Sequence, residues 1–157
     1  MLKNKRGEGY VQVSVLIIAI CMILSVFVTF ASSVNVVRLT ERNSKTVLES
    51  YLMKNSIEIY DSIKQGNNDA DSLDASEYIS DLSDFCTFAK AGSYYYHKDE
   101  NGRIEYYISK PTVGFTETGK LRLYVSYRLY VPIYFDNIRI RTAQIPITVK
   151  IDLEERF

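Results

Sequence analysis

The chain has 157 residues, and once its apolar N-terminal region is set aside the remainder fits one small domain. Its 19 Lys and Arg residues balance its 19 Asp and Glu residues, so it lacks the basic excess that neutralises nucleic-acid phosphates, and we expect no nucleic-acid partner. Its two cysteines, Cys21 and Cys86, lie far apart in the sequence, and we expect small apolar side chains rather than a disulfide framework.

The run from Val13 to Ala31 contains no charged side chain. As a helix rising about 1.5 Å per residue, it is long enough to cross the roughly 30 Å hydrocarbon layer of a bilayer. Its polar members include Ser14 and Thr29, whose hydroxyls can return to carbonyls of the preceding turn. We therefore predict a transmembrane helix over residues 13–31, preceded by a basic leader over residues 1–12.

The charges before this run indicate its orientation. Lys3, Lys5 and Arg6 precede the run and are opposed there by Glu8 alone, and positive flanking charges are retained on the cytoplasmic side. We expect a protein of the cytoplasmic membrane whose N-terminus is cytoplasmic and whose C-terminal domain is extracytoplasmic. The alternative is a cleaved secretory signal peptide, for which the small residues at positions 31–33 are a suitable cleavage site.

The segment that follows is typical of a helix. Residues 34–65 contain neither Pro nor Gly, and their apolar residues recur at spacings of three and four. Gly66, followed by two Asn residues, supplies a stop signal. We predict an amphipathic helix over residues 32–66 that extends the anchor, with a break near residues 32–35 or 43–44 left open. The expected buried positions are Leu48, Tyr51 or Leu52, Asn55, Ile59 and Ile63.

The polar segment over residues 65–74 is predicted to be a loop. Asp69, Asp71 and Asp74 raise a calcium-loop hypothesis because hard cations take several carboxylate oxygens. An EF-hand loop needs Gly at its sixth position and Glu at its twelfth, where this chain has Asp74 and Ser80. The pattern favours a solvated loop, and we expect no metal and no cofactor.

A second helix is predicted over residues 75–89, with Tyr78, Leu82 and Phe85 toward the core. Beyond residue 93 the apolar period becomes two, which is typical of strands. Gly102 supplies the positive φ of a hairpin turn over residues 99–102. Strands are expected over residues 93–98, 103–109 and 120–131 and after the Asp136-Asn137 turn.

The last stretch of the chain changes parity. Ile138 and Ile140 share one face, whereas Ile145 and the apolar residues after it take the other. Because a one-residue slip exchanges the faces of a strand, we predict a bulge or break near residues 142–144. Pro146 places this stretch at a sheet edge or at the bulge.

These elements predict an α+β fold. Its N-terminal transmembrane helix continues into the amphipathic helix, and residues 67–157 form an extracytoplasmic domain. In that domain an antiparallel sheet of about four strands packs on helix, an arrangement that buries the apolar stripe of the helix and the apolar face of the sheet in one small core.

No catalytic constellation is visible in the sequence. His97 is the only histidine, so a Ser-His-Asp arrangement would have to use it, and no nucleophile-elbow motif accompanies it. We interpret His97 as an exposed or half-buried strand residue near a turn. The spacing of Gly114 and Gly119 matches neither a phosphate loop nor a dinucleotide fingerprint, and we interpret them as turn or strand-end glycines. We expect no enzymatic activity.

The chain has 13 tyrosines and no tryptophan. Tyr124 and Tyr130 share the polar face of the long strand with Arg122 and Arg128, an arrangement that suits a flat recognition surface. Ordinary cross-strand aromatic and cation–π pairing would use the same residues. The acidic stretch over residues 58–84 and the more basic strands suit self-association, or else simply form solvated faces.

The basic leader ends in Lys-Arg-Gly at residues 5–7 and is followed by Glu8 and the apolar run. This region resembles the class III signal of type IV pilin-like proteins, and more narrowly the N-terminus of the TadE-like minor pseudopilins of tight-adherence pili. In that family a prepilin peptidase cuts after Gly on the cytoplasmic face, and the helix then anchors the protein and takes part in assembly. The resemblance implies a cut between Gly7 and Glu8, or between Gly9 and Tyr10.

The family usually keeps a Glu five positions after the cut, where this chain has Gln12, or Ser14 if the cut follows Gly9. In pilins that carboxylate is thought to neutralise a neighbour's N-terminal amine inside an apolar filament. Gln can donate and accept hydrogen bonds but carries no charge. The resemblance with Gln12 at the assembly position therefore implies a minor or assembly component rather than a major pilin.

We thus expect a non-enzymatic, single-pass, pseudopilin-like component of a bacterial pilus or secretion-type assembly. Its expected partners are the lipid bilayer, subunits of that machine and a prepilin peptidase. The alternative is a membrane-tethered binding or sensory domain with a plain anchor helix.

Overall fold

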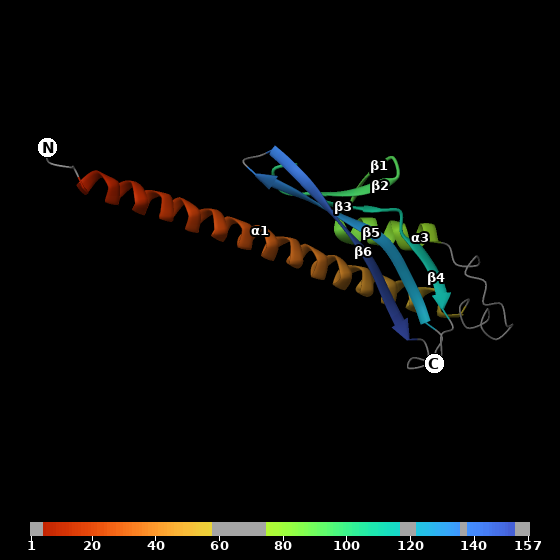
Figure 1. The fold of residues 1–157 in the computed structure, drawn as a ribbon. Coiled ribbons are helices and arrows are strands. Elements are labelled where there is room, and N and C mark those ends of the chain that lie inside the picture. Colours follow the sequence, from red (N-terminus) through yellow and green to blue (C-terminus); the bar gives the residue numbers. More distant parts are fainter. Residues whose placement is uncertain (1–4, 58–74, 117–121, 136–137, 153–157) are drawn as a thin grey trace. The chain divides into compact units, whose positions relative to one another are not determined.

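The computed structural model describes residues 5–57, 75–116, 122–135 and 138–152 (Figure 1). The chain divides into two compact units, Met1–Asn35 and Val36–Phe157, which we term the N-terminal unit and the sheet unit. A long apolar helix begins the chain, and the sheet unit contains a curled antiparallel sheet with helix on it, so the predicted α+β, pilin-like fold is confirmed. The elements are α1 (Lys5–Lys54), α3 (Ala75–Cys86), β1 (Ala89–Ala91), β2 (Tyr94–Lys98), β3 (Ile104–Ser109), β4 (Thr112–Thr116), β5 (Arg122–Phe135) and β6 (Ile138–Asp152).

Helix α1 is continuous through both of the points where a break was considered. It ends at Lys54, Asn55 lies in a turn, and the chain is helical again at residues 56–57. Of the predicted apolar stripe, Leu48, Tyr51 and Leu52 are buried. Ile59, Ile63 and the predicted helix end at Gly66 lie outside the described residues.

Helix α3 ends at Cys86, three residues before the predicted end at residue 89. Thr87 has a φ of 55°, and the N–H of Phe88 donates to the carbonyl of Ser83 over 2.8 Å. This is a Schellman closure, in which the left-handed position is usually Gly. The stop signal was missed because Thr rarely occupies that conformation.

The early end of α3 changes which residues reach the core. Tyr78 and Leu82 are buried as predicted, but Phe85 is 55% exposed, so its predicted core position is wrong. Ile79 and Cys86 are buried instead. Ile79, Leu82 and Cys86 follow one another at spacings of three and four, and Phe85 lies at the margin of the stripe that they form.

The sheet has six described strands rather than about four. Strands β3 and β4 both pair with the same edge of β5, while β6 pairs with β5 along its other edge. The chain between β3 and β4 bends at Lys110 and Pro111, so the two strands follow one another along that edge of β5 with a kink between them. Gly114 lies in the middle of β4, so its interpretation as a turn or strand-end glycine is wrong, and Gly119 lies outside the described residues.

The bulge in β6 exists, but two to four residues earlier than predicted. Arg141 pairs with Ile133 and Arg139 pairs with Tyr134, which leaves Ile140 as the extra residue. The change of parity requires one inserted residue before Ile145, and the pairing with β5 decides where it lies.

Pro146 lies in β6 opposite Arg128, and β6 pairs with β5 alone among the described strands, so the predicted edge position is confirmed. The backbone N–H of Arg128 donates to Ser109 Oγ over 3.0 Å, away from β6. Arg128 and Pro146 therefore form a non-hydrogen-bonded pair of the β5–β6 ladder. The nitrogen of Pro146, which carries no hydrogen, points to the free edge of β6, so no hydrogen bond between the two strands is lost.

One core joins the helices to the inner face of the sheet. Alternate residues of β5 are buried, which confirms the predicted alternation, and the later half of β6 supplies the neighbouring apolar side chains. The turn between β2 and β3 also follows the prediction: Gly102 has a φ of 76° and donates its N–H to the carbonyl of Asp99. The buried strand residues are Leu123, Val125, Tyr127, Leu129, Val131, Ile147, Val149 and Ile151.

Candidate functional site

The first candidate is the processing and assembly signal. Gly7, Glu8, Gly9, Tyr10 and Gln12 all lie in the first turns of α1. A Cβ added at Gly9 would meet nothing within 4 Å, and the side chain of Tyr10 is exposed. The backbone around both candidate cuts is thus helical. Of the topology charges, Lys5 and Arg6 begin α1, and Lys3 lies outside the described residues.

The apolar run lies within a helix that is long and apolar enough to cross a membrane, and none of its most apolar window is buried among the described residues. Two of its polar side chains, Ser14 and Thr29, bond to the preceding turn as predicted. Ser14 Oγ donates to the carbonyl of Tyr10 and Thr29 Oγ1 to that of Ser25, each over 2.9 Å. The run therefore presents an almost wholly apolar surface to its surroundings.

His97 has a structural partner. Its Nδ1 lies 2.8 Å from the carbonyl oxygen of Cys86, so the Nδ1–H donates to the last carbonyl of α3. The ring stacks on Tyr106, and Nε2 lies 3.6 Å from Glu105 Oε2. His97 is half-buried near the β2–β3 turn, as predicted, and it caps a helix end that would otherwise lack a partner.

Within the parts of the chain that the structure describes, no three His, Cys, Asp or Glu side chains are close enough to hold a metal ion. Asp69, Asp71 and Asp74 of the calcium-loop hypothesis lie outside those parts. Cys86 is buried, and burial raises the pKa of its thiol, although the amide of Asn43 at 3.7 Å opposes this. A thiol with a raised pKa is a poor nucleophile.

A cluster of aromatic side chains lies on the outer face of the sheet, away from the helices. We term Tyr94, Tyr96, Tyr107 and Tyr130 the tyrosine cluster. The rings of Tyr107 and Tyr130 stack at 4.8 Å and 5°, and Tyr94 meets each of them edge-on at 5.6 Å. Cross-strand neighbours produce this cluster, because Tyr107 pairs with Tyr96 on one side and with Tyr130 on the other. The crowding removes water from Tyr107 and raises its pKa, although the charge of Arg139 opposes this.

Tyr124 and Tyr130 share one face of β5, as the alternation predicts, but their rings have different neighbours. Tyr130 joins the tyrosine cluster, whereas Tyr124 lies over Gly114, its cross-strand partner. A Cβ at Gly114 would stand 3.0 Å from the hydroxyl of Tyr124. Arg122 pairs with Asp152, so it is not a free cation beside either ring. The predicted recognition surface on this strand is therefore interrupted.

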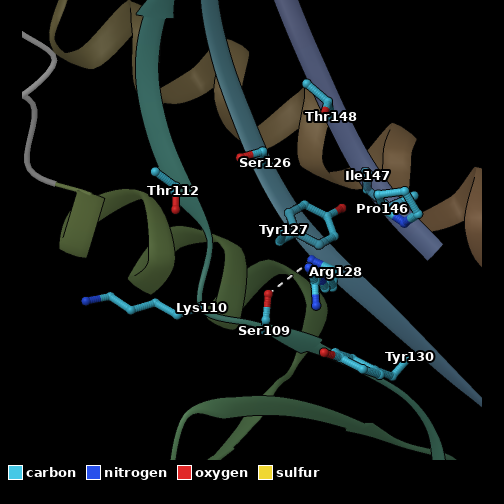
Figure 2. A pocket seen from close by; sticks show the side chains of 10 residues that line it. All are labelled: Ser109, Lys110, Thr112, Ser126, Tyr127, Arg128, Tyr130, Pro146, Ile147 and Thr148. Atoms are coloured by element: carbon cyan, nitrogen blue, oxygen red, sulfur yellow. Dashed lines mark hydrogen bonds between the residues drawn. The ribbon is translucent and has the colours of Figure 1, made fainter. Parts of the chain in front are cut away.

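A shallow depression of about 480 Å³ lies beside the tyrosine cluster, at the kink between β3 and β4 (Figure 2). Ser109, Ser126 and Thr148 bring hydroxyls to it, and Lys110 and Arg128 bring exposed cations. The residues that line it include no His or carboxylate. The depression can form polar contacts through its hydroxyls and cations.

A buried network of hydroxyls joins the sheet to α1. Ser44 Oγ and the Tyr127 hydroxyl are 2.6 Å apart, and the Tyr127 hydroxyl also lies 3.4 Å from the carbonyl of Thr40. The Tyr78 hydroxyl of α3 donates to the carbonyl of Ser44 over 3.4 Å. Burial raises the pKa of Tyr78, Tyr106 and Tyr127, which we term the buried tyrosines. Sequence reasoning missed this network because small hydroxyl side chains at a four-residue spacing on α1 also occur on exposed helix faces.

Comparison of the chain with protein-family models, with curated proteins and with solved structures gave no match.

Proposed function

We propose that this protein is a non-enzymatic, single-pass membrane component of a bacterial pilus or secretion-type assembly, similar to the TadE-like pseudopilins. The supporting observation is the continuity of α1 from the basic leader, through the apolar run, to the buried face that packs on an antiparallel sheet. In such a component one helix anchors the protein and also carries its folded domain. The proposed orientation has the N-terminus in the cytoplasm and the sheet unit outside the cytoplasmic membrane.

The leader residues support processing as part of this proposal. Gly7 is followed by Glu8, and Gln12 takes the position where pilin-like proteins usually keep Glu. Because Gln cannot neutralise a neighbour's N-terminal amine, we infer a minor or assembly role rather than the bulk of a filament. A prepilin peptidase and the subunits of the assembly platform are the proposed partners.

N-terminal mass analysis of the native protein tests the proposal. A new N-terminus at Glu8 or Tyr10 supports a pseudopilin, one near Ser33 supports a secreted protein, and an intact Met1 supports a plain anchor. Gly7→Val and Gly9→Val form a matched pair, because only the variant at the true cleavage site should remain uncut. A protein that stays intact at Met1 and does not co-purify with an assembly ATPase or inner-membrane platform would refute the proposal.

The second candidate is a membrane-tethered binding domain. The tyrosine cluster beside the shallow depression favours it, since Tyr supplies large contact area at low entropic cost. Under this alternative the chain remains uncut, and Tyr107→Ala with Tyr130→Ala abolishes partner capture without changing the N-terminus. The two candidates therefore give different results in the same mass analysis.

A further inference from the structure

The ladder of hydrogen bonds along one edge of β5 has a gap. Strand β3 pairs with β5 as far as Leu129, and β4 pairs with it from Ser126 onward. The two β5 residues in between, Tyr127 and Arg128, therefore have no partner residue in β3 or β4. The backbone N–H of Arg128 donates instead to the hydroxyl of Ser109. The shallow depression lies at this gap (Figure 2), so the path of the strands creates it.

Two kinds of polar side chain surround the depression. A row of hydroxyls crosses three strands, because Ser126 pairs with Thr112 of β4 on one side and with Thr148 of β6 on the other. About 7 Å farther along β5, Arg128 is exposed, and Lys110 extends from the kink at the rim. Neither cation has a carboxylate partner among the described residues. The depression is therefore cationic and rich in groups that both donate and accept hydrogen bonds.

An aromatic side chain borders the depression on the next row of the sheet. Tyr130, two residues after Arg128, lines the depression and is half-buried in the tyrosine cluster. Tyr107 stacks on its ring at 4.8 Å, and Tyr94 meets it edge-on at 5.6 Å. Because these neighbours already hold the ring in place, a ligand that packs on Tyr130 loses little affinity to side-chain ordering.

This combination favours a sugar over other large ligands. Tyr and Arg are common in protein–protein interfaces and do not discriminate, but Ser and Lys are depleted there, and Ser and Thr seldom dominate binding. Insertion into lipid needs exposed aliphatic side chains, and the one Ile of the lining, Ile147, is buried. Two cations on a chain without net charge are too few for the successive phosphates of a nucleic acid.

The polar groups suit a sugar that carries carboxylates. Sugar hydroxyls donate and accept hydrogen bonds, as the hydroxyls of the Ser126 row do. The C–H groups on a sugar face are weakly positive and pack against the negative face of an aromatic ring such as Tyr130. The guanidinium of Arg128 fits a planar carboxylate through two parallel hydrogen bonds. Phosphate sites usually add backbone N–H groups of a helix terminus or a nest, and no residue that lines the depression belongs to a helix.

We propose that the depression binds an acidic oligosaccharide. Arg128 pairs with a sugar carboxylate, the Ser126 row bonds to sugar hydroxyls, and Tyr130 packs on a sugar face. This inference goes beyond the assembly role proposed above and gives the surface of the second candidate function a ligand class. It requires neither a cut nor an uncut chain, so its failure and a failure in the N-terminal mass analysis are separate results.

The test is calorimetric titration of the full chain, in uncharged detergent at low salt, with tetragalacturonate, which carries a carboxylate on every sugar. Maltotetraose, of the same length without carboxylates, and tetraglutamate, with a carboxylate on every residue but no sugar, are the matched control ligands. We expect tetragalacturonate to bind at least about tenfold more tightly than either control, because each control lacks one of the two kinds of contact.

Two variants with the same change of charge locate the site. Lys110→Gln with Arg128→Gln removes both cations of the depression and should weaken the binding of tetragalacturonate at least about tenfold. Arg42→Gln with Lys45→Gln removes the same two residue types from exposed positions on α1, which packs on the inner face of the sheet, and should leave the affinity unchanged. Tyr130→Ala should weaken binding at least about threefold.

The opposite results overturn the inference. Equal affinity for tetraglutamate would assign the surface to an acidic protein segment, and equal affinity for maltotetraose would show that no sugar carboxylate pairs with Arg128. An equal loss of binding in the α1 variant would indicate a general effect of charge. Absence of saturable binding of tetragalacturonate to the folded chain would overturn the inference outright. Near-ultraviolet circular dichroism of each variant verifies that the sheet unit is folded.

Discussion

Replacement of Ser44 by Ala tests whether the buried hydroxyl network fixes α1 on the sheet. Ser44 is fully buried, and its hydroxyl lies 2.6 Å from that of Tyr127, which is also buried. Without it, the Tyr127 hydroxyl keeps only the long 3.4 Å contact to the carbonyl of Thr40. A buried polar group left without a good partner costs about 1–3 kcal/mol, and we expect Ser44→Ala to lower the free energy of unfolding by about 2 kcal/mol.

Tyr127→Phe should cost less, about 0.5–1.5 kcal/mol. In that variant the Ser44 hydroxyl can rotate to the carbonyl of Thr40, one turn earlier in the helix, so that no buried donor loses its partner. The double variant should be no less stable than Ser44→Ala alone, because the change at Tyr127 removes the group that Ser44→Ala leaves unsatisfied.

The assay is urea unfolding of the full chain in mild detergent, followed by the near-ultraviolet circular dichroism of its tyrosines, because the chain has no tryptophan. With a urea dependence of about 2 kcal/mol per molar, Ser44→Ala should lower the midpoint by about 1 M. Strictly additive costs in the double variant would refute the reasoning, as would a Ser44→Ala cost below about 0.5 kcal/mol.

Four further changes test the packing of the same unit. Leu48→Ala, at a fully buried position, should cost about 2–5 kcal/mol in the same urea assay, whereas Leu39→Ala on the same helix, 51% exposed, should cost less than about 1 kcal/mol. Thr87→Gly should stabilise by about 1 kcal/mol, because Gly takes the positive φ at the end of α3 without strain, and a loss of stability would contradict the Schellman assignment. Gly114→Ala should cost about 1 kcal/mol when Tyr124 is present and little when Tyr124→Ala has removed the ring it would meet, a difference that a double-mutant cycle measures. The buried tyrosines have pKa values raised above the ordinary 10.0. Their contribution to the free energy of unfolding is therefore complete below about pH 10 and falls at higher pH, by up to about 1.4 kcal/mol per pH unit for each phenol. Absorbance at 295 nm should show these phenols ionising only as the protein unfolds.

Local patterns determined most of the fold. The apolar run, the stripe through Leu48 and Leu52, the Gly102 turn and the alternation in β5 each depend on neighbours within a few residues, and the structure has all of them. Gly102 was predictable because a tight turn needs a positive φ there.

The rest of the fold depends on residues that are distant in sequence. Strand β4 was missed because Gly114 weakens it locally, and the compensating ring of Tyr124 comes from another strand. The end of α3 at Cys86 was missed because Thr87 is not a usual stop residue and the carbonyl of Cys86 bonds to His97, eleven residues later. Neither contact leaves a periodic signal in the sequence.

The candidate surfaces also depend on residues that are distant in sequence. Sequence alternation correctly placed Tyr124 and Tyr130 on one face of β5, but six residues of strand hold them about 20 Å apart. The tyrosine cluster requires the order β2–β3–β5, which the sequence did not specify. The leader residues remain predictable from the sequence alone, because their proposed role is chemical recognition by a peptidase and not tertiary packing.

The buried hydroxyls fix the position of the sheet along residues 36–54 of α1. Apolar contacts alone are not directional, so they would tolerate a slide of the sheet by one helical turn, about 5.4 Å. The contacts of Tyr127 with Thr40 and Ser44 make such a slide costly, because each hydroxyl would lose its partner in a site that water does not reach.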